Sequence, residues 1–120
     1  MCYKASCVRY VARRQLERLA SLGYSLLSGV ELEFTLLNEE TRAPIFTGKD
    51  FFSNLCMTQH SDFLCGLDKV LQEARISLND LHVEPAQGQF EVNYEPVWGL
   101  QGGDWPFFVR EAIKEMAIRY

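Results

Sequence analysis

The segment VELEFT, residues 30–35, alternates strictly between apolar and polar side chains, and this pattern constrains the fold more than any other feature. Because successive side chains of a strand point to opposite faces, the alternation predicts a strand with one apolar and one polar face. Such a strand belongs in a sheet whose apolar face is covered by other elements. Its two glutamates, Glu31 and Glu33, then share the uncovered face.

Two segments on either side of this strand space their apolar residues as amphipathic helices do. The first covers residues 8–22, with arginines on a face expected to be solvated, and Gly23 follows where a left-handed C-terminal cap is expected. The second covers residues 61–74, with Ser61 as the expected N-cap. Helices of this kind supply the apolar surface that a half-buried strand needs.

The second half of the chain predicts two short strands and a last helix. The strands are expected near residues 81–84 and 88–94, joined by a turn. Asp104 is a good N-cap, and Pro106 follows where a proline of the first helical turn is tolerated. The expected buried stripe of this helix is Phe107, Phe108, Ala112, Ile113, Met116 and Ala117.

The order helix, strand, helix, strand, strand, helix predicts an α+β fold with a mostly antiparallel sheet and flanking helices. Residues 39–49 contain a proline and a glycine and are expected to form a loop, while residues 50–57 are ambiguous. At 120 residues the chain is at most one ordinary domain.

Composition excludes several functional classes. The formal charge of −4 gives no general nucleic-acid footprint, so no nucleic-acid partner is expected. No apolar run is long enough to span a bilayer, and no membrane partner is expected. The four cysteines form no CxxC pair. They could form two disulfides, but reduced thiols in a cytoplasmic protein are the favoured interpretation.

The carboxylates allow a sharper hypothesis. Glu31 and Glu33 on one face of a strand repel each other unless water solvates them or a cation lies between them. Glu84 and Glu91 form a second pair across the expected turn. If that hairpin lies beside the first strand, the four carboxylates converge in one cavity on the concave side of the sheet. Hard ions such as Mg²⁺ and Mn²⁺ prefer oxygen ligands of this kind, although a plainly solvated acidic face remains open.

Three longer segments resemble the catalytic domain of glutamine synthetases, nearest the lengsin-like branch. They are RYVARRQLERLASLGYSLLSGVELEFTLL, LHVEPAQGQFEVNYEP and DWPFFVREAIKEMA, which cover most of the chain in the order of the family. The resemblance implies a partial glutamine synthetase catalytic domain. It also implies the family activity, in which ATP phosphorylates the γ-carboxylate of glutamate and ammonia then displaces phosphate.

Site residues follow from the resemblance position by position. Glu33, Glu84 and Glu91 correspond to ligands of the metal that holds glutamate, and Glu31 corresponds to a ligand of the second metal, which contacts the ATP phosphates. The implied cofactor is Mg²⁺ or Mn²⁺, with ATP as co-substrate. His82 could hydrogen-bond a ligand or be a surface histidine.

Other positions carry weaker expectations. Gln89 could orient a ligand or simply flank the turn. Asn79 stands where many relatives have a glutamate near the nucleotide, which puts that contact in doubt. A set of aromatic residues is expected in the core or at subunit contacts rather than as a stacking platform: Trp98, Trp105, Phe107 and Phe108.

Members of the family are several times longer than this chain. Residues 1–120 are therefore expected to be the N-terminal part of the catalytic domain, with the small N-terminal domain and the C-terminal remainder absent. The intact family implies glutamate, ATP and ammonia as partners and a ring-shaped homo-oligomer. Three functions remain open: a fragment of a glutamate–ammonia ligase, a non-catalytic structural protein like the lengsins, or a small stand-alone metal-binding module.

Overall fold

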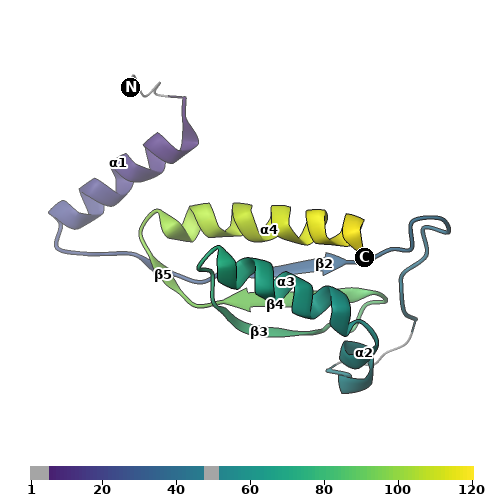
Figure 1. The fold of residues 1–120 in the computed structure, drawn as a ribbon. Helices are drawn as coiled ribbons and strands as arrows, with labels where there is room; N and C mark the ends of the chain where they lie inside the picture. Colours follow the sequence, from purple (N-terminus) through teal and green to yellow (C-terminus); the bar gives the residue numbers. More distant parts are fainter. Residues whose placement is uncertain (1–5, 48–51) are drawn as a thin grey trace.

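The computed structural model describes residues 6–47 and 52–120 and shows antiparallel strands with helices packed against them (Figure 1). A three-stranded sheet has the order β2-β4-β3, and β1 pairs with β5 in a separate two-stranded sheet. This architecture confirms the expected α+β class. The elements in chain order are α1 (Val8–Ser21), β1 (Leu27–Ser28), β2 (Glu31–Thr35), α2 (Asn54–Gln59), α3 (Ser61–Glu73), β3 (Leu78–Val83), β4 (Gln89–Tyr94), β5 (Val97–Trp98) and α4 (Gln101–Arg119).

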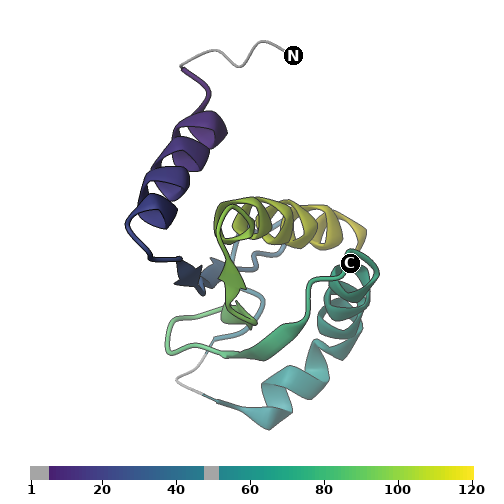
Figure 2. The same ribbon diagram turned by 90° about the vertical axis from the view of Figure 1, so that its left-hand side faces the viewer.

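The apolar face of the three-stranded sheet packs against α3 and α4, which lie side by side in both views (Figures 1 and 2). The ring of Trp105 on α4 meets the ring of Tyr94 on β4 edge-on, with centroids 5.6 Å apart. This packing fixes the central strand β4 and leaves its other face for polar side chains. The buried cluster draws on both layers and consists of Cys56, Phe63, Leu64, Leu67, Leu71, Ile76, Val83, Phe90, Val92, Tyr94, Val109, Ile113 and Met116.

The first helix ends as the sequence predicts. Gly23 has φ +84°, and the N–H groups of Gly23 and Tyr24 donate to the carbonyls of Ala20 and Leu19. These two bonds form a Schellman motif, which a glycine accommodates because it has no Cβ. The expected cap is therefore confirmed.

Helix α1 lies apart from the two-layer body and has no buried residue (Figure 2). Arg9 tethers it to α4 through two bonds to the carboxylate of Asp104, of 2.8 and 2.9 Å. Arg9 is exposed, as expected for an arginine on the solvated face, and its planar guanidinium also matches the carboxylate of Asp104 with two parallel bonds.

The start of α4 differs from the prediction. The helix begins at Gln101 rather than after Asp104, and the carbonyl of Leu100 accepts the N–H groups of Gly103 and Asp104. Asp104 therefore lies in the first turn, where a carboxylate still interacts favourably with the positive end of the helix dipole. Pro106 consequently stands inside the helix rather than at its first position.

The segment that was ambiguous in the sequence contains a short helix. Helix α2 begins at Asn54, and the hydroxyl oxygen of Ser53 accepts the N–H of Cys56 at 3.2 Å. Residues 50 and 51 of the segment lie outside the described residues. The next helix has His60 as its cap residue, so the prediction of Ser61 as N-cap is wrong. The reason is that α2 and α3 are separated by only one residue, which leaves no extended residue at position 61.

The buried stripe of α4 is also narrower than expected. Ile113 and Met116 are buried as predicted, together with Val109, which the prediction omitted. Positions 109, 113 and 116 lie on one helical face, and this face alone meets the sheet and α3. Phe107 and Phe108 are 54% and 55% exposed, and Ala117 is exposed, so their assignment to the buried stripe is wrong.

Two expectations drawn from composition concern the cysteines and the membrane. Cys7 and Cys65 are free thiols, and Cys2 lies outside the described residues. Within residues 6–47 and 52–120, none of the helices has both the length and the apolar character needed to cross a bilayer.

Candidate metal site

The polar face of the three-stranded sheet carries the acidic residues singled out in the sequence. Glu33 on β2 lies opposite Glu91 on β4, and Glu91 lies opposite His82 on β3. Residues directly opposite each other share a face, so these three side chains form one row across all three strands. Glu31 lies two residues before Glu33 and therefore on the same face, opposite Asn93.

Three side chains in and beside this row form a compact group. Nε2 of His82 lies 2.8 Å from Oε1 of Glu84 and 4.0 Å from Oε1 of Glu91. One nitrogen or oxygen atom from each of the three residues lies within 4.8 Å of the others. The side chains are only 12–15% exposed. The site is therefore partly screened from water, where the interactions of a charge with its neighbours are stronger than at an open surface.

Neighbouring amides hold two of the carboxylates in place. Nδ2 of Asn93 donates to Oε1 of Glu91 at 2.9 Å, and Nε2 of Gln89 donates to Oε2 of Glu33 at 2.5 Å. Both amides lie on β4, two residues on either side of Glu91, and therefore on the same face. Gln89 thus stands beside a predicted ligand, as does His82 beside Glu84.

The structure does not bring all four predicted carboxylates equally close together. Glu84 and Glu91 belong to the compact group, whereas Glu33 contacts Gln89 and Glu31 lies further along β2. Glu31 and Glu33 are also more exposed than Glu84 and Glu91. Among the described residues, the group of nearby donor atoms contains His82 in place of either β2 glutamate.

The pKa of His82 reports the electrostatic character of the group. Burial alone would lower the pKa of His82, but hydrogen bonds to Glu84 and Asp80 and the negative charges of Asp80 and Glu91 outweigh burial and raise it. A site that raises the pKa of an imidazole is one that favours positive charge. The same field would favour a bound cation.

Sequence reasoning missed three residues around the site. Asp80 contacts His82, Asn93 contacts Glu91, and the ring of Phe52 lies 4.7 Å from the His82 ring, centroid to centroid. Period-2 alternation would have found Asp80, had the predicted strand begun at Leu78 instead of Leu81. The same alternation places Asn93 beside Glu91, whereas no local pattern predicts the contact of Phe52.

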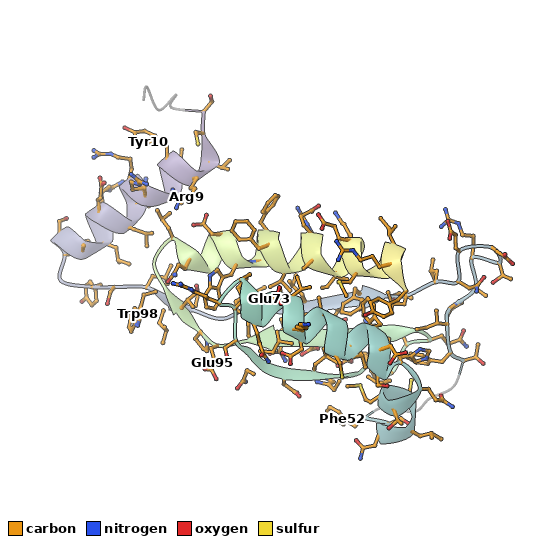
Figure 3. The ribbon with its side chains drawn as sticks, viewed as in Figure 1. Arg9, Tyr10, Phe52, Glu73, Glu95 and Trp98 are labelled. Carbon is orange, nitrogen blue, oxygen red and sulfur yellow. The ribbon has the colours of Figure 1, made fainter. Side chains whose placement is uncertain are left out.

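The remaining candidates lie around the edge of the site or away from it. Asn79 stands at a register shift of β3, between Leu78 and Asp80. Trp98 on β5 is 59% exposed and points away from the sheet (Figure 3). Trp105 packs against the core, while Phe107 and Phe108 stack edge-on against each other at the surface.

The donor set fits a divalent cation. Four carboxylates on one face offer the oxygen ligands that Mg²⁺ and Mn²⁺ take, and the partly buried pair of Glu84 and Glu91 lies close enough to share one ion. The orphaned Oδ1 of Asn93, which is buried without a hydrogen-bond partner among the described residues, adds a further oxygen beside the row.

Comparison with known proteins identifies the family of this chain. The family model "Glutamine synthetase, catalytic domain" matches residues 5–120. The chain therefore belongs to the glutamine synthetase catalytic domain family. A solved structure described as a novel glutamine synthase homolog superposes with a TM-score of 0.82 at 26% identity, over 95% of this chain and 26% of that chain.

Related sequences include ligases and a lengsin. The glutamate–isopropylamine ligase of Pseudomonas sp is 28% identical over 93% of this chain, and lengsin of Homo sapiens is 27% identical over the same share. Glutamine synthetase of Thermotoga maritima is 31% identical over 92%. The chain spans 27%, 22% and 26% of the lengths of these relatives, respectively.

Proposed function

We propose that the polar sheet face is part of the metal centre of an ATP-dependent glutamate–ammonia ligase that uses Mg²⁺ or Mn²⁺. In this proposal Glu33, Glu84 and Glu91 hold the ion that binds glutamate, and Glu31 helps to hold a second ion at the ATP phosphates. The observation that carries the proposal is the row of Glu33, Glu91 and His82 across the sheet with Glu84 at 2.8 Å from His82. Membership of the glutamine synthetase catalytic domain family supports this reaction class.

The residues of this chain would act by binding the metal ions and orienting the carboxylates that hold them. When bound, the ions supply Lewis-acid chemistry that neutralises charge on carboxylate and phosphoryl oxygens. Asn93 restricts the rotation of Glu91, so that this carboxylate is already oriented before any ligand arrives. Gln89 holds Glu33 beside the group, and Glu33 would turn toward the ion when it binds. The apolar layer behind β4 keeps the row rigid, because every second residue of β4 is buried in the core.

The complete reaction would need parts of the protein that these residues do not supply. The chain covers about a quarter of the length of its ligase relatives, and we propose that it contributes the N-terminal part of a catalytic domain. The proposed assembly is a cytoplasmic homo-oligomeric ring that binds glutamate, ATP and ammonia. The exposure of Trp98, Phe107 and Phe108 supports their use at contacts between subunits.

The second candidate is a non-catalytic structural protein of the lengsin type. The 27% sequence identity to lengsin supports this candidate. The partly buried carboxylates favour the ligase, because Glu84 and Glu91 close to each other are costly where no cation is bound. The two candidates differ in one simple property, the binding of divalent ions to the polar sheet face.

Thermal unfolding with and without divalent ions tests the proposal. An ion that binds only the folded chain stabilises it by about 2.7 kcal/mol at a concentration 100 times its Kd. We expect the melting temperature to rise with millimolar Mg²⁺ or Mn²⁺, and the rise to disappear in Glu33→Gln/Glu84→Gln. The matched control is Glu73→Gln/Glu115→Gln, which neutralises two exposed carboxylates on the helices and should keep the rise. A melting temperature indifferent to metal would favour the structural role.

A further inference from the structure

Asp80 is anchored at both carboxylate oxygens. Its Oδ1 accepts the N–H of Leu81 at 2.8 Å, and its Oδ2 lies 2.8 Å from Nδ1 of His82. A register shift in β3 between Leu78 and Asp80 places Asp80 opposite Asn93, on the polar face of the sheet. From Asp80 onward the register is regular, so Asp80 and His82, two residues apart, share one face of the sheet.

This contact determines which nitrogen of His82 carries the proton. An ionised carboxylate only accepts hydrogen bonds, so the short contact to Asp80 requires a proton on Nδ1. In the neutral ring, Nε2 then presents its lone pair. Nε2 faces Oε1 of Glu84 at 2.8 Å, with Oε1 of Glu91 at 4.0 Å. A positive charge has to bridge this short contact, and either a proton on Nε2 or a metal ion in its place supplies it.

We propose that Asp80 is a positioning residue that makes His82 a nitrogen ligand, through Nε2, of the ion held by Glu84 and Glu91. A carboxylate that accepts the second N–H of a metal-binding histidine fixes the ring and raises its basicity. The inference rests on the proposed metal centre and deepens it. An imidazole ligand shifts selectivity, because nitrogen suits Co²⁺ and Zn²⁺ better than Mg²⁺, which prefers oxygen.

The substitution Asp80→Asn tests the assignment with a minimal change in shape. The N–H of Leu81 needs an acceptor, so the amide oxygen of Asn at position 80 would face Leu81 and its NH₂ group would face His82. An NH₂ group donates, so Nδ1 would become the acceptor and the proton would move to Nε2. A protonated Nε2 has no lone pair for an ion. The variant thus removes the nitrogen ligand and leaves all the glutamates in place.

The experiment compares Co²⁺ and Mg²⁺ on the full 120-residue chain by isothermal titration calorimetry. We expect Asp80→Asn and His82→Gln each to weaken Co²⁺ binding roughly 10- to 100-fold, the usual effect of losing such a partner. Mg²⁺ binding should weaken much less, because Mg²⁺ depends mainly on the carboxylate oxygens, and the Mg²⁺ binding that remains also shows that each variant is folded. The double variant should weaken Co²⁺ no further, because both substitutions remove the same ligand. The control Asp68→Asn alters a partly exposed aspartate of α3 that bonds Gln72, and should change neither affinity.

Nitrogen-15 NMR of the imidazole gives an independent signature that a merely structural role would not change. In the wild-type chain, addition of Zn²⁺ should shift the Nε2 resonance of His82 and leave its Nδ1 proton in place. In Asp80→Asn the metal-free neutral ring should show its proton on Nε2 and none on Nδ1. These spectra report the tautomer directly and do not depend on enzymatic turnover.

Each outcome has a distinct meaning. Selective loss of Co²⁺ binding in both single variants supports the role of Asp80. Equal weakening of Co²⁺ and Mg²⁺ binding, or no effect on either, overturns that role while the carboxylate metal centre stands. If the wild-type chain binds neither ion, the metal centre fails and the role of Asp80 fails with it.

Discussion

The buried hydroxyl of Tyr94 makes the stability of this fold depend on alkaline pH. Tyr94 is only 3% exposed, and its hydroxyl has no hydrogen-bond partner among the described residues. Burial raises the pKa of Tyr94 from 10 to about 12, because the phenolate would lose its hydration. The unfolded chain therefore loses this proton at lower pH than the folded chain. Stability should be fully present below about pH 10 and fall as the pH rises toward 12, by roughly 2–3 kcal/mol in total.

Urea unfolding at a series of pH values from 8 to about 11.5 measures this effect. The difference in unfolding free energy between the wild type and Tyr94→Phe isolates it, since other groups titrate equally in both. Tyr94→Phe should match or exceed the wild type near neutral pH, because it removes an unpaired buried hydroxyl. Above pH 10 the unfolding free energy of Tyr94→Phe should rise relative to that of the wild type. Tyr24→Phe, at a residue 66% exposed, is the control and should follow the wild type. Parallel curves for wild type and Tyr94→Phe would refute the reasoning.

Three shorter predictions concern the tether of α1, the core and the activity. The hydrogen bonds from Arg9 hold the pKa of Asp104 below its usual value. The ion pair should therefore stabilise the fold at pH values above the usual pKa of an aspartate, and this stabilisation should be lost as the pH falls through the lowered pKa. Asp104→Asn should accordingly speed hydrogen exchange in α1 at neutral pH, at a cost of less than about 1 kcal/mol. Leu67→Ala, at a fully buried site, should cost about 2–5 kcal/mol in urea unfolding, whereas Leu55→Ala, at a site 69% exposed, should cost little. The isolated chain should form no glutamine from ATP, glutamate, ammonium and Mg²⁺ above background, because phosphoryl transfer depends on positioning groups that these residues do not supply.

Local patterns predicted the parts of this fold that depend on local physics. The alternation of residues 30–35 defines both faces of β2, because side chains of a strand alternate whatever the surroundings. Gly23 marks the end of α1 because few residues other than glycine adopt its positive φ readily. The placement of Glu31 and Glu33 on one face of β2 follows from the same alternation. Residues two apart on a strand always share a face.

The parts that sequence reasoning missed depend on partners distant along the chain. Aspartate is a residue type favoured at N-caps, but the carboxylate of Asp104 bonds Arg9, 95 residues away. Phe107 and Phe108 are as hydrophobic as core residues, yet both are exposed. The packing of α4 against α3 determines which face of α4 meets the sheet, and these two residues lie outside that face. Asp80 was missed for a different reason: the register shift between Leu78 and Asp80 interrupts the alternation of β3, and the predicted strand began only at Leu81.

The central claim is that the carboxylates of the polar sheet face share a divalent ion, and anomalous X-ray scattering from Mn²⁺-soaked crystals tests it most directly. The account predicts an anomalous peak within coordination distance of carboxylate oxygens of Glu84 and Glu91, with Glu33 turned from Gln89 toward the ion. The peak should vanish in crystals of Glu33→Gln/Glu84→Gln. A wild-type crystal with ordered side chains on this face and no peak among them, at millimolar Mn²⁺, would contradict the account.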